Sequence, residues 1–144
     1  MLELRSNNLA FSFTQVHPSA KLTIDLQRTL RIPDDGRTYP LPPGRGSFPL
    51  RLIDSYKSKL PPSWTEKGGV LLPMYQSEAL WINFSPFKDP NTGAHYPFAV
   101  KVSTGKVSAI TGETWQDGLR QKDYCVSPKH PWIDGYVVEN GKIK

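Results

Sequence analysis

The sequence predicts a mainly β domain, a β-sandwich or a partly open barrel, with one short helix near residues 49–59; an α+β fold is the alternative. Two observations favour strands. The chain of 144 residues contains 14 prolines and 11 glycines, and a proline inside a helix costs about 3 kcal/mol. Several segments also alternate apolar and polar residues, as half-buried strands do. The length predicts a single domain over residues 1–144.

Two strands are predicted in the N-terminal part of the chain. Residues 9–16 alternate, and residues 22–32 alternate more strictly, with leucines and isoleucines on one face. Arg28 is the one charged residue on that apolar face. We expect it to snorkel to solvent or to pair with a carboxylate, and a ligand contact is the alternative.

A long loop rich in proline and glycine is predicted over residues 33–47. Loops of this length are often functional, but the proline density fits an extended surface strap equally well. Residues 49–59 carry apolar side chains at helical spacing. Ser47 is a candidate cap for this helix, and Pro61-Pro62 is expected to end it.

The densest apolar run spans residues 68–84 and holds a glycine pair, a proline, three aromatic residues and a carboxylate. Residues 78–85 within it predict a central strand, because both faces are largely apolar and so imply cover on both sides. We expect the β segments to be arranged around Trp81.

Two hairpins are predicted in the C-terminal part. Ser103-Thr104-Gly105-Lys106 lies between strands over 98–102 and 107–110, and Glu139-Asn140-Gly141 lies between 136–138 and 142–144. The returning strand of the second hairpin has only about three residues. Three explanations stay open: a chain truncated at the C-terminus, a split-off fragment, or a last strand that pairs at an exposed edge.

Composition bounds the class of protein. The formal charge is +5 and the pI is near 9.4, but aspartates are interleaved with the arginines from Arg28 to Arg51. This mixture disfavours a nucleic-acid patch, and weak binding through those arginines is kept as an alternative. The single Cys125 excludes an internal disulfide and suggests a reducing cytoplasm. No run is apolar enough for a signal peptide or a membrane span.

No metal or cofactor site is predicted. The three histidines have no ligand spacing, and the chain has neither a Walker A loop nor a GxSxG elbow. We expect Cys125 to be a small buried hydrophobe rather than a nucleophile.

Paired carboxylates are the remaining catalytic pattern. Glu78 stands near Tyr75 and Trp81, and a carboxylate among aromatic rings would have a raised pKa, as a general acid needs. Asp123 or Asp134 would be its partner. The alternative is that Glu78 closes a turn or pairs with an arginine.

Four aromatic residues are candidates for ligand binding: Tyr75, Trp81, Tyr124 and Trp132. Trp115, Tyr124, Trp132 and Tyr136 also cluster near Asp117, Asp123 and Asp134. Aromatic faces beside carboxylates bind sugars or cations. They also serve as core and rim residues of β domains, and both interpretations stay open.

Three long motifs resemble those of an uncharacterised family of bacterial and fungal proteins: GGVxxPMYQSEALW from Gly68, AVKVxxGKVxAITGE from Ala99 and QKDYxVSPxxPWxDG from Gln121. The resemblance covers roughly residues 48–144. It implies that the family continues beyond Lys144 with further glycine-rich β segments, and it implies no activity, cofactor or catalytic residue.

Together these patterns favour a cytoplasmic, non-enzymatic binding or assembly domain. A C-terminal β edge would pair with a second copy or with another polypeptide. A hydrolase or carbohydrate-processing enzyme that uses Glu78 with Asp123 or Asp134 is the alternative, and it requires the two carboxylates to lie roughly 5–10 Å apart.

Overall fold

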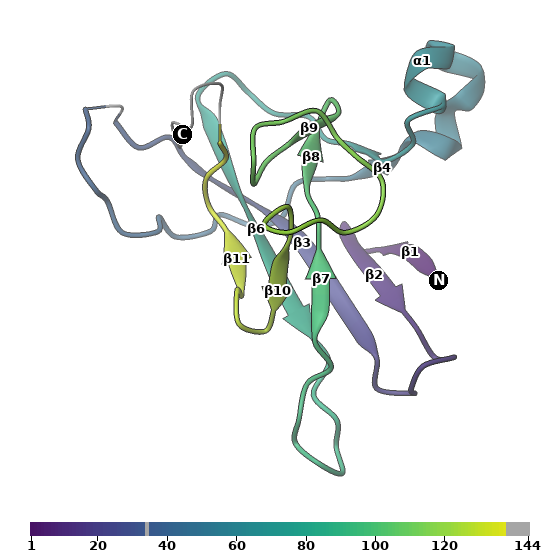
Figure 1. Cartoon of the computed structure of the whole chain (residues 1–144). Helices are drawn as coiled ribbons and strands as arrows, with labels where there is room; N and C mark the ends of the chain where they lie inside the picture. The colour runs from purple at the N-terminus through teal and green to yellow at the C-terminus, as the bar shows by residue number, and fades with distance from the viewer. Residues whose placement is uncertain (34, 138–144) are drawn as a thin grey trace.

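The computed structural model describes residues 1–33 and 35–137, and this part of the chain is mainly β (Figure 1). Its strands are β1 (Leu2–Arg5), β2 (Asn8–Ser12), β3 (Lys21–Leu30), β4 (Arg51–Leu52), β5 (Val70–Leu71), β6 (Glu78–Pro86), β7 (Phe98–Val100), β8 (Ser103–Thr104), β9 (Val107–Ser108), β10 (Cys125–Ser127) and β11 (Trp132–Ile133). The helical segments are the 3-10 helix η1 (Ile53–Lys59) and α1 (Pro62–Thr65). The predicted fold class is confirmed.

The main layer is a five-stranded antiparallel sheet in the order β1-β2-β3-β6-β11. Nine residue pairs join β3 to β6, from Leu22 opposite Pro86 to Leu30 opposite Glu78. Strands β7 and β10 form a second, two-stranded sheet that lies in front of β3 and β6 in Figure 1. No closed barrel forms from the described strands.

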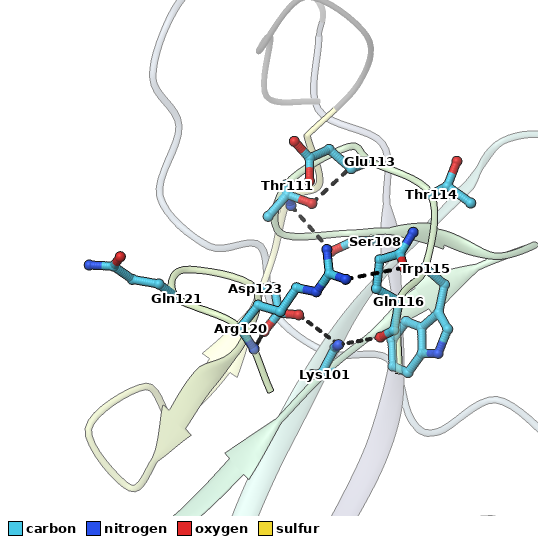
Figure 2. Close-up of a pocket in the computed structure, with 10 residues that line it drawn as sticks. All are labelled: Lys101, Ser108, Thr111, Glu113, Thr114, Trp115, Gln116, Arg120, Gln121 and Asp123. Atoms are coloured by element: carbon cyan, nitrogen blue, oxygen red, sulfur yellow. Dashed lines mark hydrogen bonds and ion pairs between the residues drawn. The ribbon is translucent and has the colours of Figure 1, made fainter. Parts of the chain in front are cut away.

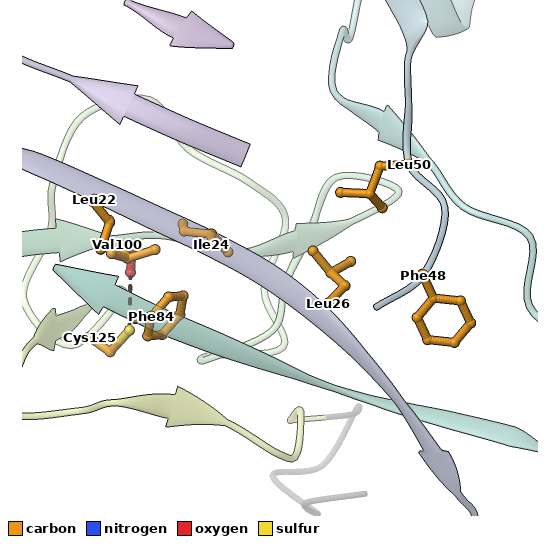
Figure 3. Packing of buried hydrophobic residues seen from close by; sticks show 8 residues of the cluster. All are labelled: Leu22, Ile24, Leu26, Phe48, Leu50, Phe84, Val100 and Cys125. Atoms are coloured by element: carbon orange, nitrogen blue, oxygen red, sulfur yellow. Dashed lines mark hydrogen bonds between the residues drawn. The ribbon is translucent and has the colours of Figure 1, made fainter. Parts of the chain in front are cut away.

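The core lies between these two layers (Figure 3). We call the side of the main sheet that faces it the inner face. Its buried members are Leu22, Ile24, Leu26, Phe48, Leu50, Phe84, Val100 and Cys125. Because strand side chains alternate, the leucines and isoleucines of β3 all reach this core from one side of the strand.

The C-terminal part of the long loop extends the main sheet. Beyond the end of β2, the backbone of Arg28 donates a 2.8 Å hydrogen bond to Gly46 O and accepts a 2.7 Å bond from Arg45 N. Phe48 N donates to Leu26 O at 2.8 Å. These bonds hold residues 43–48, which we call the strap, against β3, and they support the strap interpretation for this part of the loop.

Two tight hairpins have both central residues at positive φ, as a type I′ turn requires. One joins β8 to β9 through Gly105 (φ 59°) and Lys106 (φ 75°), where the sequence predicts a hairpin. The other joins β1 to β2 through Ser6 (φ 47°) and Asn7 (φ 68°), and was not predicted. Strand β7 pairs with the distant β10 instead of continuing the predicted hairpin.

The predicted helix over residues 49–59 is only partly correct. Residues 51–52 are extended and pair with β5, and the helical segment that follows is the 3-10 helix η1. Its N-terminal flank is Leu52, not the expected cap Ser47. Pro62 occupies the first turn of the further helix α1, where its missing N–H costs nothing.

The remaining predictions about strands have different outcomes. Trp81 lies in β6 and is half-buried, as the central-strand prediction requires. The predicted cover on both sides of β6 does not form. The core covers one side of the strand, and the other side lies beside polar side chains of β3. The predicted hairpin around Asn140-Gly141 lies outside the described residues.

The buried aromatic ring of the strap should matter strongly for stability. Phe48 is fully buried at 0% exposure, so Phe48→Ala should lower the free energy of unfolding by about 3–5 kcal/mol in urea titration. Leu119→Ala is the control, since Leu119 is 60% exposed and should change it by less than about 0.5 kcal/mol. Equal effects of the two substitutions would contradict this placement of the core.

Candidate functional site

The side of the main sheet opposite the core carries a polar and aromatic set of side chains, which we call the outer face. Its members on β3, β6 and β11 are Thr23, Asp25, Gln27, Thr29, Ala79, Trp81, Asn83, Ser85 and Trp132. The register places these residues in cross-strand pairs, whose Cβ atoms lie about 4.5–5.5 Å apart. The outer face therefore forms one continuous surface across three strands.

A hydrogen-bonded network around Asp25 occupies the middle of the outer face. Asn83 Nδ2 donates to Asp25 Oδ1 at 2.9 Å, and Gln27 Nε2 donates to Asp25 Oδ2. Asn83 Nδ2 also reaches Ser85 Oγ at 3.0 Å. Asp25 is only 8% exposed, and no cation pairs with it among the described residues. The two amides thus supply the hydrogen bonds that a buried carboxylate requires.

Two indoles flank this network. Trp132 on β11 lies directly opposite Asn83, and Trp81 lies opposite Gln27. Trp132 is 45% exposed, whereas Trp81 is half-buried. If the β6–β11 register is extended by one residue, the exposed Asp134 comes beside Trp81. Three of the residues selected from the sequence therefore gather on the outer face.

The strap covers one end of the outer face, and Ser85 and Trp132 are exposed away from it. Thr29 Oγ1 donates to Pro43 O at 3.1 Å, and Thr29 is buried. Gly44 lies so close that a Cβ atom there would be 2.5 Å from Gln27 Oε1 and 3.4 Å from the Trp81 ring. A side chain at position 44 would therefore displace the end of the Gln27 side chain.

Two buried polar atoms on this side of the sheet have no hydrogen-bond partner within the described part of the chain. They are Trp81 Nε1 and Asn8 Oδ1. Asn8 belongs to the outer face because it lies two residues from Ala10, which pairs with Thr23. Buried polar groups are normally paired, so unsatisfied groups here mark the outer face as unusual.

Glu78, the first catalytic candidate, lies on the inner face and is held by Arg28. Arg28 Nε donates to Glu78 Oε1 at 2.9 Å, and a second guanidinium nitrogen contacts the same oxygen. Tyr75 N donates to Glu78 Oε2 at 3.0 Å. This backbone bond and the Arg28 bond lower the pKa of Glu78. The expected raised pKa is therefore wrong, and both parts of the alternative account are correct.

Asp123, the second candidate, pairs with Lys101 in a small pocket of about 80 Å³ (Figure 2). Lys101 Nζ lies 2.6 Å from Asp123 Oδ2, and it donates to the carbonyl oxygens of Gln116 and Gly118 at 2.7 Å each. It also lies 4.4 Å from the Trp115 ring centroid. The hydrogen bond from Lys101 lowers the pKa of Asp123. All three donors of this ammonium group are engaged, so it organises the loop.

The other predicted residues lie apart from the outer face. Tyr75 is 74% exposed in the segment before β6, and Tyr124 is 36% exposed beside β10. An open depression of about 480 Å³ is lined by Leu30, Arg31, Gln76 and Ser77. None of the candidate residues lines it.

The sequence analysis did not select Asp89, which is buried in the loop after β6. Ser19 Oγ donates to Asp89 Oδ2 at 2.6 Å, and the backbones of Asn91 and Thr92 each donate to Oδ1 at 2.9 Å. His17 Nδ1 lies 4.0 Å from the same carboxylate. The Ser19 hydroxyl donates to the aspartate, and the Ser19 backbone N–H donates to His17 Nδ1 at 3.1 Å. No histidine nitrogen accepts the hydroxyl proton, so this trio does not activate a nucleophile. The Asp-Pro-Asn-Thr-Gly sequence was a signal for this loop.

Asn83 and Gln27 were also missed, although they form the network. Polar residues on one side of a strand are ordinary in a solvated sheet, so their pattern offers no reason to select them.

Comparison with protein-family models, with curated proteins and with solved structures yields no match to this chain. Within the described residues, no group of three or more His, Cys, Asp or Glu side chains is arranged to hold a metal ion. Across residues 1–33 and 35–137, no helix has the length and apolar character needed to cross a membrane. The family resemblance stays a prediction.

The Asp89 carboxylate should give the domain a pH-dependent stability. Its hydrogen bonds, first that from Ser19, lower its pKa from 3.8 to about 2. A carboxyl group with a lowered pKa in the folded state stabilises at pH above 4, and this contribution is lost as the pH falls from about 4 to 2. The difference in Tm between the wild type and Asp89→Asn should therefore be constant above pH 4 and narrow below it.

Thermal unfolding followed from pH 7 to pH 2 measures this difference. Asp54→Asn, on the exposed surface, controls for the substitution itself. A difference between the wild type and Asp89→Asn that keeps the same size at pH 2 as at pH 7 would rule out this role for Asp89.

The Lys101–Asp123 pair should show energetic coupling. Both side chains are about one-tenth exposed, at 9% and 11%, so removing either charge leaves the other buried without its partner. Lys101→Met and Asp123→Asn should each lower the free energy of unfolding, and the double variant should lose less than their sum. The exposed Asp54–Lys57 pair, at 3.1 Å, is the control cycle, and its coupling should be close to zero. Additive effects of the two substitutions on the free energy of unfolding would contradict a stabilising interaction between Lys101 and Asp123.

Proposed function

We propose that this domain is a non-enzymatic binding domain and that its ligand surface is the outer face of the main sheet. The observation that carries the proposal is the Asp25 network, which lies in register with two indoles on neighbouring strands. Binding sites combine aromatic side chains with a few polar groups held in fixed positions. The outer face has both, and its members Ser85 and Trp132 are exposed.

The hydrolase alternative has less support. Glu78 is paired with Arg28 and Asp123 with Lys101, and the pKa of each carboxyl group is lowered. A general acid near neutral pH needs a raised pKa instead. Asp134 is the remaining candidate, and it is exposed.

The nucleic-acid alternative also has less support. Arg28, its first arginine, is engaged by Glu78, and Arg37 lies 3.8 Å from Asp35. Arg31 and Arg45 are exposed, but they lie among carboxylates in the sequence, so their field is diluted.

Assembly through a β edge is kept as part of the proposal. The two-residue strand β11 is one edge of the main sheet, and β1 is the other. An edge strand offers unpaired backbone groups to a second chain, which supports pairing with another copy or another polypeptide. We place the domain in the cytoplasm, because its single cysteine is buried in β10 and suits a reducing compartment.

A screen of small polar compounds by two-dimensional NMR tests the binding surface even though the ligand is unidentified. Compounds that bind should shift the side-chain amide signals of Asn83 and Gln27 and the indole signal of Trp132. Signals of the Lys101 loop, such as the Trp115 indole, provide the internal comparison. Binders that shift only the Lys101 loop, or a library without a single binder on the outer face, would overturn the proposal.

A further inference from the structure

The charges of the outer face limit the kind of ligand that it can accept. Between Thr23 and Thr29 of β3, and on the paired positions of β6 and β11, the outer face carries no cation. Lys21, the first outer-face residue of β3, lies at the end of this surface with its ammonium group 5.4 Å from the Phe87 ring centroid. The carboxylate of the outer face, Asp25, would repel phosphates and other anions. Both Asp25 oxygens already accept amide hydrogen bonds, so they offer little to a cationic ligand either. A neutral ligand fits this surface best.

The hydrogen-bonding groups of the outer face suit hydroxyl groups. Asn83 and Gln27 each use their amide nitrogen on Asp25, which fixes the orientation of both amides. Within the described residues, the amide oxygen of Asn83 takes part in no hydrogen bond, whereas that of Gln27 faces Gly44 of the strap. The exposed Ser85 hydroxyl lies beside Asn83 and can both donate and accept. Asn83 and Ser85 therefore place an acceptor and a hydroxyl group next to each other on β6.

The indole of Trp132 adds a flat apolar surface next to these two groups. It lies opposite Asn83 and is 45% exposed. A sugar ring has an apolar face of C–H bonds and a rim of hydroxyl groups. The apolar face of the sugar can therefore pack on the indole while its hydroxyl groups reach adjacent amides. An indole suits this contact because its ring face is apolar and its N–H edge is polar.

We propose that the ligand is a neutral saccharide chain that lies across β11 and β6. This inference rests on the proposed function, since it names the ligand class for the same surface. One sugar ring packs on Trp132, and hydroxyl groups of the same or the next ring bind Asn83 and Ser85. The Asp25 carboxylate holds the Asn83 amide in place before the ligand arrives, which reduces the entropy lost on binding.

Affinity electrophoresis of the intact protein tests the saccharide class. The probes are the neutral polysaccharides hydroxyethylcellulose, xylan, mannan and starch, with heparin as the anionic comparison. At least one neutral polysaccharide should retard the migration of the wild type. Any retardation by heparin should be the same for the wild type and for Trp132→Ala, because heparin should not bind the outer face. Trp132→Ala should weaken the retarding interaction about tenfold, the loss expected for one aromatic contact.

Trp64→Ala is the matched control, because Trp64 is exposed to nearly the same extent, 47%, but lies in α1. It should leave retardation unchanged. Circular dichroism of each variant establishes that the fold is retained. Asn83→Ala provides a second variant, and it should weaken binding even if Trp132→Ala fails to fold.

Three results would overturn the inference: no retardation by any neutral polysaccharide, equal retardation of the wild type and both outer-face variants, or retardation by heparin that Trp132→Ala abolishes. The NMR screen separates this failure from failure of the proposed function. Small compounds that bind the outer face while all neutral polysaccharides fail would leave the binding surface in place and remove only the saccharide class.

Discussion

The ladder between β3 and β6 is the constraint on which the rest of the structure depends. Its nine pairs fix one register, and alternation then assigns every side chain of both strands to the inner or the outer face. A shift by one residue would turn Leu22 and Ile24 outward and bring Asp25 into the core. The core and the outer network are therefore two consequences of the same alignment, and neither can be changed without the other.

The same alignment makes Arg28 and Glu78 partners. Each is an exception on the apolar inner face, and the sequence shows both exceptions but not the register. Because Arg28 lies opposite Leu80 and Glu78 opposite Leu30, the two charges occupy diagonal positions on one face, within reach of long side chains. Aromatic surroundings raise the pKa of a carboxyl group only while no cation is near. The backbone hydrogen bond from Tyr75 N, together with the Arg28 guanidinium, lowers the pKa of Glu78 instead.

Local patterns predicted those parts of the fold that depend on neighbours in sequence. Strict alternation located β3, and a run that is apolar on both faces located β6, each to within two residues of its ends. A glycine-containing turn located β9, whereas β8 lies within the residues predicted as that turn. The pairing of β7 with β10 joins Val100 to the distant Cys125, and nothing local encodes it. The helix prediction over 49–59 was only partly correct for a related reason. Its buried apolar residues are Leu50, in the extended segment before β4, and Ile53, at the start of the 3-10 helix η1. Helical spacing was therefore not evidence of one continuous α-helix.

The residues of the candidate site also differ in whether the sequence alone could identify them. Trp81 and Trp132 could be selected as aromatic residues, but only the backbone bond from Phe84 N to Pro131 O, at 2.8 Å, shows that their strands are adjacent. Asn83 and Gln27 could not be selected, because a solvated sheet face needs polar residues of any kind. A solvated face does not, however, need a carboxylate at 8% exposure whose oxygens are both held by side-chain amides. Burying that charge costs free energy, and the hydrogen bonds from the two amides offset part of this cost. Forming these bonds also costs the rotational freedom of both amide side chains. Such a network does more than keep a sheet in water: it holds the Asn83 amide oxygen in a fixed direction, which is what recognition of a ligand's hydroxyl groups requires.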